Sequence, residues 1–345
     1  MDNTIVGVDL AKRVIQVCIY TNKKVHSNIE MTSGEFLLWL FQHKPTTIIF
    51  EACSGSNYWK QKAIEAGHEA LLISALLVKT VRQNQKTDKN DALAIIQASQ
   101  LADIGFINGK THKQQQLQTM LKLRDLAVKH QTALRNQLIA LLAEFNIHSS
   151  SRNGGIRSAV GNLLEDADNG FTFECRDVIR VAYDHIIAQG KIVDQYDKQL
   201  QNSIEQHEDC KRLLRLEGVG TINAINLYIA LGCGDMGLFK KGKDASACIG
   251  LTPKQYSSGG VIKLGAIGNR VKHGKLRSQL IVGAMAVVGH IDKRAAKTKK
   301  EFWLKKLIER KGKKCAAVAL ANKTVRTAFA MITQGTDYKA ELLTA

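Results

Sequence analysis

The sequence lacks the features of membrane, secreted and fibrous proteins. No stretch of its 345 residues reaches the roughly 20 uninterrupted apolar residues that a bilayer crossing needs. The chain begins Met1-Asp2-Asn3-Thr4, with no basic segment ahead of an apolar run, so we expect neither secretion nor membrane insertion. Only two prolines, no evident repeats and 45% hydrophobic residues exclude a fibrous or wholly disordered chain. We therefore expect a soluble globular protein of about two domains.

Paired cysteines are also missing. The seven cysteines are scattered and include no Cys-x-x-Cys pair, which argues against both a zinc cluster and a disulfide framework. We expect reduced thiols and a cytoplasmic protein. The sequence also lacks the Gly-x-x-x-x-Gly-Lys-Ser/Thr loop that cradles the phosphates of ATP.

The net charge of +18 is confined to one end of the chain. Residues 1–210 hold 23 basic and 23 acidic residues, whereas residues 211–345 hold 26 basic and 8 acidic residues. Such a surface favours a polyanionic partner, because Lys and Arg release condensed counterions when they neutralise phosphates. Nucleic acid is the first candidate, and an anionic membrane surface is the second.

The N-terminal part has the pattern of an α/β domain. Strands are expected at residues 4–9, 14–20, 24–32, 46–50 and 70–73, and helices at residues 34–42, 58–65 and 88–101. Strands come first and then alternate with helices, which is typical of a single α/β layer sandwich.

The rest of the chain is expected to be mostly helical. Residues 113–147 predict one long helix, and apolar residues recur every seven positions from Ile179 to Leu200. These two segments are expected to pair as an antiparallel coiled coil or to dimerise, with a loop at Ser149–Gly155 between them. We divide the chain into residues 1–110, 111–210 and a basic, mostly helical part at 211–345.

Four acids are predicted to converge in the N-terminal domain. Asp9 and Glu51 each end an apolar strand, and Asp88 and Asp91 share one face at the start of a helix. Such carboxylates can bind two Mg²⁺ ions, which stabilise the attacking and leaving oxygens of phosphoryl transfer. The alternative is structural: each acid is an exposed strand end or a helix cap, with Asp88 as the N-cap.

Three C-terminal features are candidates for contact with nucleic acid. Ser257 and Ser258 precede Gly259-Gly260, a sequence that is also typical of a solvent-facing turn. Gly218 and Gly220 resemble the hairpin of helix-hairpin-helix modules, although a plain helical turn fits equally well. Basic residues are the third feature, although a charge run can also be a solvated helix face. The phosphate-contact candidates are Lys254, Arg270, Lys272, Lys275, Arg277, Lys299, Lys300, Lys305 and Lys306.

Several short motifs together carry a resemblance that spans nearly the whole chain. They are Gly7-Val8-Asp9, Phe50-Glu51-Ala52-Cys53, Lys86-Thr87-Asp88-Lys89-Asn90-Asp91-Ala92, Gly218-Val219-Gly220, Gly250-Leu251-Thr252-Pro253, Ser257-Ser258-Gly259-Gly260, Gly268-Asn269-Arg270 and Ala317-Val318-Ala319-Leu320-Ala321-Asn322-Lys323. In this order and spacing, the sequence resembles the DEDD-type insertion-sequence transposases of the IS110 family, particularly the IS1111 subgroup, whose relatives include Piv-like DNA invertases.

The resemblance implies a RuvC-like, RNase H-fold domain, a helical coiled-coil insert and a transposase domain. It implies that Asp9, Glu51, Asp88 and Asp91 form the DEDD tetrad that binds Mg²⁺, or Mn²⁺ in its place. It also implies a serine nucleophile directly before a glycine, which is Ser258, with Ser257 as the reserve. A phosphoserine link to DNA and a free 3′-OH would then allow strand exchange by transesterification.

The resemblance further implies the partners. Donor and target DNA would be recognised through a structured non-coding guide, the bridge RNA, that pairs with both. The protein would act as a homo-oligomer, a dimer or tetramer. Three alternatives stay open: a RuvC-like endonuclease that uses metal-activated water, a non-catalytic nucleic-acid-binding scaffold, and an invertase of the same chemistry that works without RNA.

Overall fold

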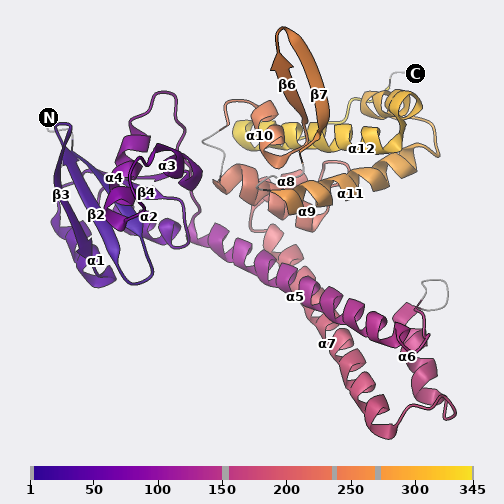
Figure 1. The fold of residues 1–345 in the computed structure, drawn as a ribbon. Helices are drawn as coiled ribbons and strands as arrows, with labels where there is room; N and C mark the ends of the chain where they lie inside the picture. Colours follow the sequence, from indigo (N-terminus) through magenta and orange to yellow (C-terminus); the bar gives the residue numbers. More distant parts are fainter. Residues whose placement is uncertain (1–3, 150–154, 235–238, 269–272, 344–345) are drawn as a thin grey trace. The chain divides into compact units, whose positions relative to one another are not determined.

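The computed structural model describes residues 4–149, 155–234, 239–268 and 273–343 (Figure 1). The chain forms two compact units: residues 116–208 make one, and residues 1–115 together with 209–345 make the other. Within the described residues, no helix is both long and apolar enough to cross a bilayer.

A five-stranded sheet is the centre of the N-terminal domain. Its strands are β1 (Thr4–Leu10), β2 (Ile15–Thr21), β3 (Lys24–Met31), β4 (Thr47–Glu51) and β5 (Glu69–Ile73), in the order β3-β2-β1-β4-β5. Strands β1, β2 and β3 pair in antiparallel fashion, whereas β4 is parallel to both β1 and β5. All five predicted strands are therefore confirmed, with ends that differ by at most one residue.

Helices cover both faces of this sheet. Apolar side chains of α1 (Ser33–Gln42) and α2 (Ser56–Glu65), including Phe36 and Ala63, share a core with Val6, Val8 and Phe50. On the other face, α3 (Ala75–Val81) and α4 (Asp88–Ser99) pack through further buried side chains. The expected α/β layer sandwich is confirmed, and α3 is a helix that the sequence pattern did not predict.

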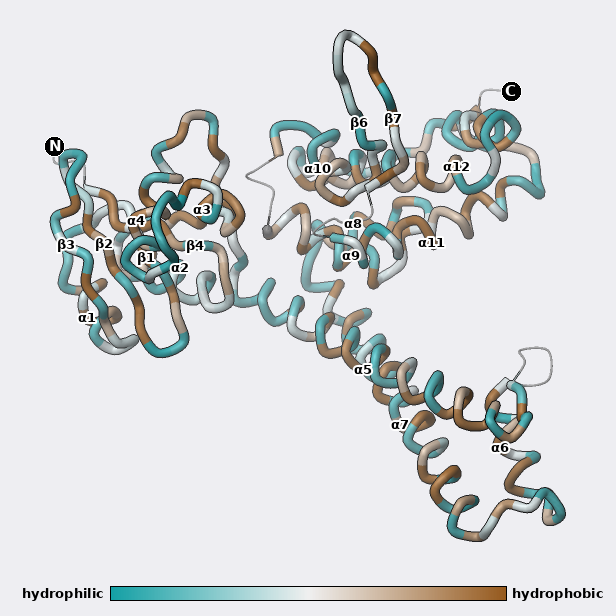
Figure 2. Tube along the Cα trace, in the orientation of Figure 1, coloured by the Kyte–Doolittle hydropathy of each residue, from teal (hydrophilic) through white to brown (hydrophobic). Residues whose placement is uncertain are grey.

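The second unit is a helical hairpin with a short helix at its end. Helices α5 (His112–Ala143) and α7 (Phe173–Ile204) carry alternating hydrophobic and hydrophilic bands (Figure 2). The helix α6 (Gly155–Glu165) lies within the predicted connection and shares a core with Leu138, Leu142 and Ile186. Leu141 and Phe145, two large apolar residues of the predicted long helix 113–147, are 52% and 60% exposed and so lie outside the core of this unit.

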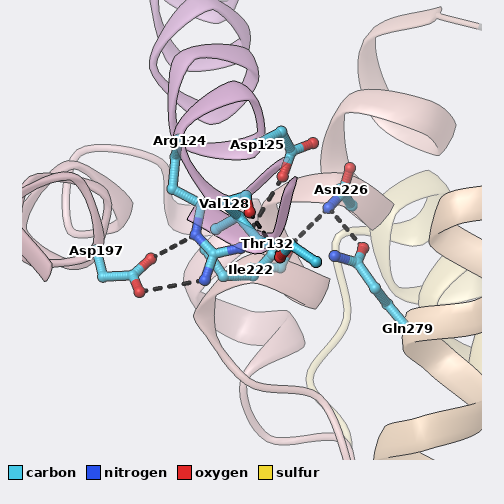
Figure 3. Close-up of polar contacts among 8 residues, drawn as sticks. All are labelled: Arg124, Asp125, Val128, Thr132, Asp197, Ile222, Asn226 and Gln279. Carbon is cyan, nitrogen blue, oxygen red and sulfur yellow. Dashed lines mark hydrogen bonds and ion pairs between the residues drawn. The ribbon is translucent and has the colours of Figure 1, made fainter. Parts of the chain in front are cut away.

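A bidentate ion pair fastens α5 to α7 inside this unit. Arg124 Nε and Nη2 lie 2.8 Å and 3.2 Å from the two carboxylate oxygens of Asp197 (Figure 3). The two predicted seams therefore pair within one chain. The exposed face keeps large apolar residues, among them Leu126, Val178 and Val181.

The C-terminal part is helical apart from one β-hairpin. Its elements are α8 (Glu208–Leu213), α9 (Thr221–Leu227), the π-helix η2 (Tyr228–Gly234), α10 (Gly242–Ile249), β6 (Pro253–Ser258), β7 (Val261–Ile267), α11 (Gly274–Ile291) and α12 (Lys299–Gln334). Helix α12 contains non-helical backbone at Gly312. The hairpin projects from the helices (Figure 1), and every residue of β6 is exposed.

Glycine allows α9 and α11 to pack closely. Gly218 has φ +77°, and a Cβ atom there would lie 2.8 Å from the carbonyl oxygen of Gly283. Nearby, Asn226 Nδ2 donates to Oε1 of Gln279 at 3.2 Å and to the carbonyl of Ile222 (Figure 3). The position of Gly218 is therefore explained by packing, and Gly220, which is exposed, is the N-cap of α9.

Candidate active site

Strand register brings the first two acids to one edge of the sheet. β1 and β4 run parallel with Val8 opposite Phe50, so Asp9 and Glu51 follow at the same level on neighbouring strands. Residues at the same level of a sheet point to the same face. Both acids are half-buried. The structure therefore places this pair together, as the sequence predicted.

Gly7 brings the other two acids over the same edge. Gly7 and Asp9 point to one face of β1, and a Cβ at Gly7 would lie only 2.4 Å from the carbonyl oxygen of Ala92 in α4. Only a glycine allows α4 to approach β1 so closely. The first turn of α4 carries Asp88 and Asp91, and this turn therefore lies beside Asp9.

Neither Asp88 nor Asp91 is the N-cap of α4. The N-cap of α4 is Thr87, whose side chain accepts a hydrogen bond from the Asn90 N–H. The alternative that Asp88 is the N-cap is therefore wrong. Asp88 is exposed and Asp91 is buried, at 7% exposure.

The acids influence one another electrostatically. Burial raises the pKa of Asp9, and the negative charges of Asp91 and Asp88 raise it further, against the opposing effect of Lys86. Burial also raises the pKa of Glu51, with Asp9 and Asp91 adding to the shift. Repulsion among partly buried carboxylates is relieved by a bound cation.

A basic side chain of the protein already contacts one of the acids. Arg82 Nη1 lies 2.7 Å from Oδ1 of Asp91. Among the described residues, no three acid, histidine or cysteine side chains are arranged to hold a metal ion. The donor set nevertheless fits Mg²⁺ or Mn²⁺, because four carboxylates supply hard oxygen ligands and two of them have raised pKa values. Arg82 was not singled out by the sequence analysis, because nothing in its neighbours marks it.

The candidate serines end a strand instead of lying in a turn. Gly259 and Gly260 have φ of +55° and +78°, the combination that a two-residue type I′ hairpin turn requires. Ser257 and Ser258 are the last residues of β6, opposite Ile262 and Val261.

Strand alternation separates the two hydroxyl groups. Gln255 Nε2 donates to Oγ of Ser257 at 2.9 Å, so these two side chains share one face of the hairpin. Ser258 lies on the opposite face together with Tyr256, and Lys263 is the cross-strand partner of Tyr256. The serine that directly precedes the glycine therefore has a lysine within reach on its own face, a neighbour that the sequence analysis missed.

The predicted phosphate contacts differ in their surroundings. Lys254, Lys275, Lys299 and Lys306 are exposed, and Lys305 and Arg277 are half-buried. Lys300 is bound to Glu217 at 2.7 Å, lies over the ring of Tyr338, and has a side chain only 11% exposed. Lys300 is therefore part of an ion pair inside the fold. Arg270 and Lys272 lie outside the described residues.

Several basic residues between Lys293 and Lys314 are neutralised within the protein. Besides Lys300, the side chains of Arg294, Lys299 and Lys313 pair with Glu301, Glu341 and Asp292. Mutual repulsion among these bases is therefore relieved in part inside the protein, and the remaining bases favour an outside polyanion.

Comparison with known proteins identifies the family. Residues 6–147 match the DEDD-type IS110 transposase domain, and residues 210–300 match the transposase domain of the IS116/IS110/IS902 family. A transposase for insertion sequence element IS1111A from Coxiella burnetii is 34% identical over 339 residues, covering 98% of this chain and 92% of that protein. The chain belongs to the IS110 family of transposases.

Two further relatives are similar to the chain over nearly its whole length. A probable family 20 transposase from Pseudomonas aeruginosa is 31% identical, over 97% of this chain and 98% of that protein. A pilin gene-inverting protein from Moraxella bovis is 23% identical over 98% of both chains. The family confirms the predicted resemblance and implies an RNase H-like N-terminal domain, with which the mixed sheet described above agrees.

Proposed function

We propose that this IS110 transposase cuts and rejoins DNA through a covalent link to Ser258, assisted by Asp9, Glu51, Asp88 and Asp91. The observation that carries the proposal is the convergence of these acids at the ends of β1 and β4 and the start of α4. The alternatives without catalysis leave this cluster of partly buried, mutually repelling charges unexplained.

The four acids are the proposed ligands of Mg²⁺, or of Mn²⁺. Such an ion neutralises charge on a scissile phosphate and favours the ionised form of a hydroxyl nucleophile. Asp91 reaches this role by exchanging its contact with Arg82, which then becomes available to a phosphate oxygen. Asp9 and Glu51 would bind the cation from the sheet edge.

The proposed reaction conserves the bond energy of the DNA backbone. The Ser258 oxygen forms a bond to phosphorus, the bond from phosphorus to the 3′ oxygen breaks, and the departing 3′ oxygen takes up a proton. A different 3′-OH then attacks the phosphoserine and releases Ser258. No ATP is consumed, in agreement with the missing ATP-binding loop. Lys263, on the face of Ser258, would pair with the phosphate.

The proposed partners are donor DNA, target DNA and a bridge RNA. The net charge of +18 on residues 211–345 supports the binding of several nucleic-acid strands to this part of the chain. A homo-oligomer, a dimer or tetramer, is the proposed working form, in which the serine of one protomer serves the acids of another. The exposed apolar residues of α5 and α7, such as Leu126 and Val181, support assembly through the helical hairpin.

The test compares two neighbouring serines. Purified wild-type protein, Ser258→Ala and Ser257→Ala are incubated with labelled donor DNA, a candidate bridge RNA from the flanks of the gene and Mg²⁺, and are then separated on denaturing gels. We expect a protein-linked DNA band with the wild type and with Ser257→Ala, and its loss with Ser258→Ala. Cleavage by Ser258→Ala at the wild-type rate would instead identify a water-using endonuclease. Omission of the RNA separates a guided recombinase from an unguided one.

A further inference from the structure

The C-terminal part contains a large groove that the proposed chemistry does not use. It lies along one side of α12 and is closed by α10 and by the foot of the β6–β7 hairpin, where Pro253, Gly265 and Ile267 contribute to its wall. Its volume is about 1630 Å³. Pockets for single small molecules measure roughly 300–1,000 Å³, so this groove is large enough for a segment of a polymer.

The charge of the groove is of one sign. Six of the described residues that line it are basic and none is acidic; the six are Lys240, Lys241, Lys243, Lys314, Lys323 and Arg326. Asp244, the nearest acid along α10, accepts a hydrogen bond from the Lys241 N–H and serves as a helix cap. The groove therefore attracts an anion with several negative charges.

An aromatic ring and an apolar floor lie among these bases. Trp303 is 37% exposed, and Lys323 Nζ lies 5.0 Å from the centroid of its ring. The floor consists of small apolar side chains of α12, including Val318, Ala319 and Ala330. Positive charges beside an exposed indole ring suit a ligand that alternates phosphates with flat aromatic groups.

We propose that this groove binds an unpaired stretch of nucleic-acid strand, with a base stacked on Trp303 and phosphates paired to Lys323, Arg326 and Lys314. The inference rests on the proposed function, since strand exchange and guide pairing both require unpaired strands. A duplex does not fit this chemistry, because its bases are stacked on each other and offer no free ring face to the indole. The strand can be DNA or RNA, because both supply the same groups.

A cysteine in the groove provides a local reporter. Cys315 lines the groove and is the exposed one of the seven cysteines, whereas Cys175, in the helical unit, is half-buried and serves as an internal reference. The full chain is treated with N-ethylmaleimide in EDTA, which prevents cleavage, and alkylation is followed by mass spectrometry. The probes are a 12-nucleotide oligo(dT), a 12-nucleotide oligo(rU) and a 12-base-pair DNA duplex.

We expect at least one of the two single strands to slow alkylation of Cys315 several-fold and to leave Cys175 unchanged, while the duplex gives little protection. Stronger protection by oligo(rU) assigns the groove to RNA, and stronger protection by oligo(dT) assigns it to DNA. Alkylation of Cys315 that is unchanged by saturating single strands, or is slowed equally by the duplex, overturns the proposal.

Matched variants link this protection to the groove. Trp303→Ala is expected to weaken single-strand binding about tenfold, and Trp303→Phe, which keeps a stacking ring, is expected to restore most of it. Lys323→Gln should lower the salt dependence of single-strand binding by about 0.7 in log–log slope, the value for one lost phosphate contact. Lys311→Gln removes the same charge at an exposed position of α12 outside the groove and should leave the slope unchanged. Equal effects of the two lysine changes contradict the proposal.

The two proposals fail separately. If Cys315 stays unprotected while the Ser258-dependent DNA adduct forms, the groove proposal alone is wrong. If the groove binds single strands but no adduct forms, the serine chemistry alone is wrong.

Discussion

The close approach of α4 to β1 at Gly7 gives a sharp test of how the acids are placed. In Gly7→Ala the new methyl group would lie 2.4 Å from the Ala92 carbonyl oxygen and 2.6 Å from Cγ1 of Ile96. Ordinary contacts begin at about 3.4 Å, so α4 has to move away by about 1 Å. Overpacking of this kind costs roughly 1–3 kcal/mol of folding free energy. Because α4 carries Asp88 and Asp91, the same movement separates them from Asp9.

The expected result is a larger loss of activity than of stability. A misplacement of about 1 Å can lower a reaction rate by roughly 100-fold. Unfolding in urea measures the stability of Gly7→Ala, and DNA cleavage at a temperature where the variant is folded measures its rate. Gly34→Ala is the matched control, because a Cβ there meets no atom within 4 Å and alanine favours the helix α1. A Gly7→Ala variant with wild-type stability and wild-type cleavage would refute this account of the site.

Three further predictions concern charge. Burial and neighbouring acids raise the pKa of Glu51, so the carboxyl group binds its proton more tightly in the folded protein than in the unfolded chain. Glu51→Gln should therefore raise the melting temperature of the metal-free protein at pH 7 by about 2–4 °C. This gain should vanish below pH ~4, and circular dichroism follows the melting at each pH. Burial opposes ionisation of Glu217, but the hydrogen bonds that its carboxylate accepts from Lys300, the backbone and Tyr338, together with the charge of Lys300, outweigh burial and lower its pKa. The stability that the Lys300–Glu217 pair supplies is present above the ordinary carboxyl pKa of about 4.3 and is lost as the pH falls through the lowered value. Lys300→Met should cost about 1–3 kcal/mol of the free energy of unfolding at pH 7. Glu217→Gln should reduce the fall of the free energy of unfolding at acid pH, as measured by urea unfolding. Arg124→Ala should cost only about 0.5–1 kcal/mol in urea unfolding, because Asp197 is 40% exposed; a cost above 3 kcal/mol would show that the pair is not screened by solvent.

The sequence predicted the sheet well because its strands are apolar and bounded by polar residues. β1, β2 and β4 are buried and rich in β-branched residues, and Asp9 and Glu51 lie at the ends of β1 and β4, at the edge where the site forms. It predicted the long helices for the same kind of reason, since their apolar residues repeat at helical spacing. The positions of strand ends and a helix start predicted the four acids, whereas the choice of Ser258 came from the family resemblance, because no periodicity marks a nucleophile.

The elements that were missed are short or exposed. α3 has seven residues, too few for a helical period to stand out, and α6 follows a polar, glycine-containing segment. The β6–β7 hairpin is exposed on both faces, so it lacks the alternation that marks a half-buried strand. The contact of Arg82 with Asp91 and the groove around Trp303 depend on tertiary packing and have no local signal.

The central claim is that a serine at the end of β6 becomes joined to DNA. Digestion of the trapped protein–DNA complex with trypsin and nuclease should release residues 255–263, a peptide that contains Tyr256, Ser257 and Ser258. Fragmentation by mass spectrometry identifies which hydroxyl carries the nucleotide. The account predicts a nucleotide phosphate on Ser258, and a nucleotide on Tyr256 or Ser257, or cleaved DNA with an unmodified peptide, would contradict it.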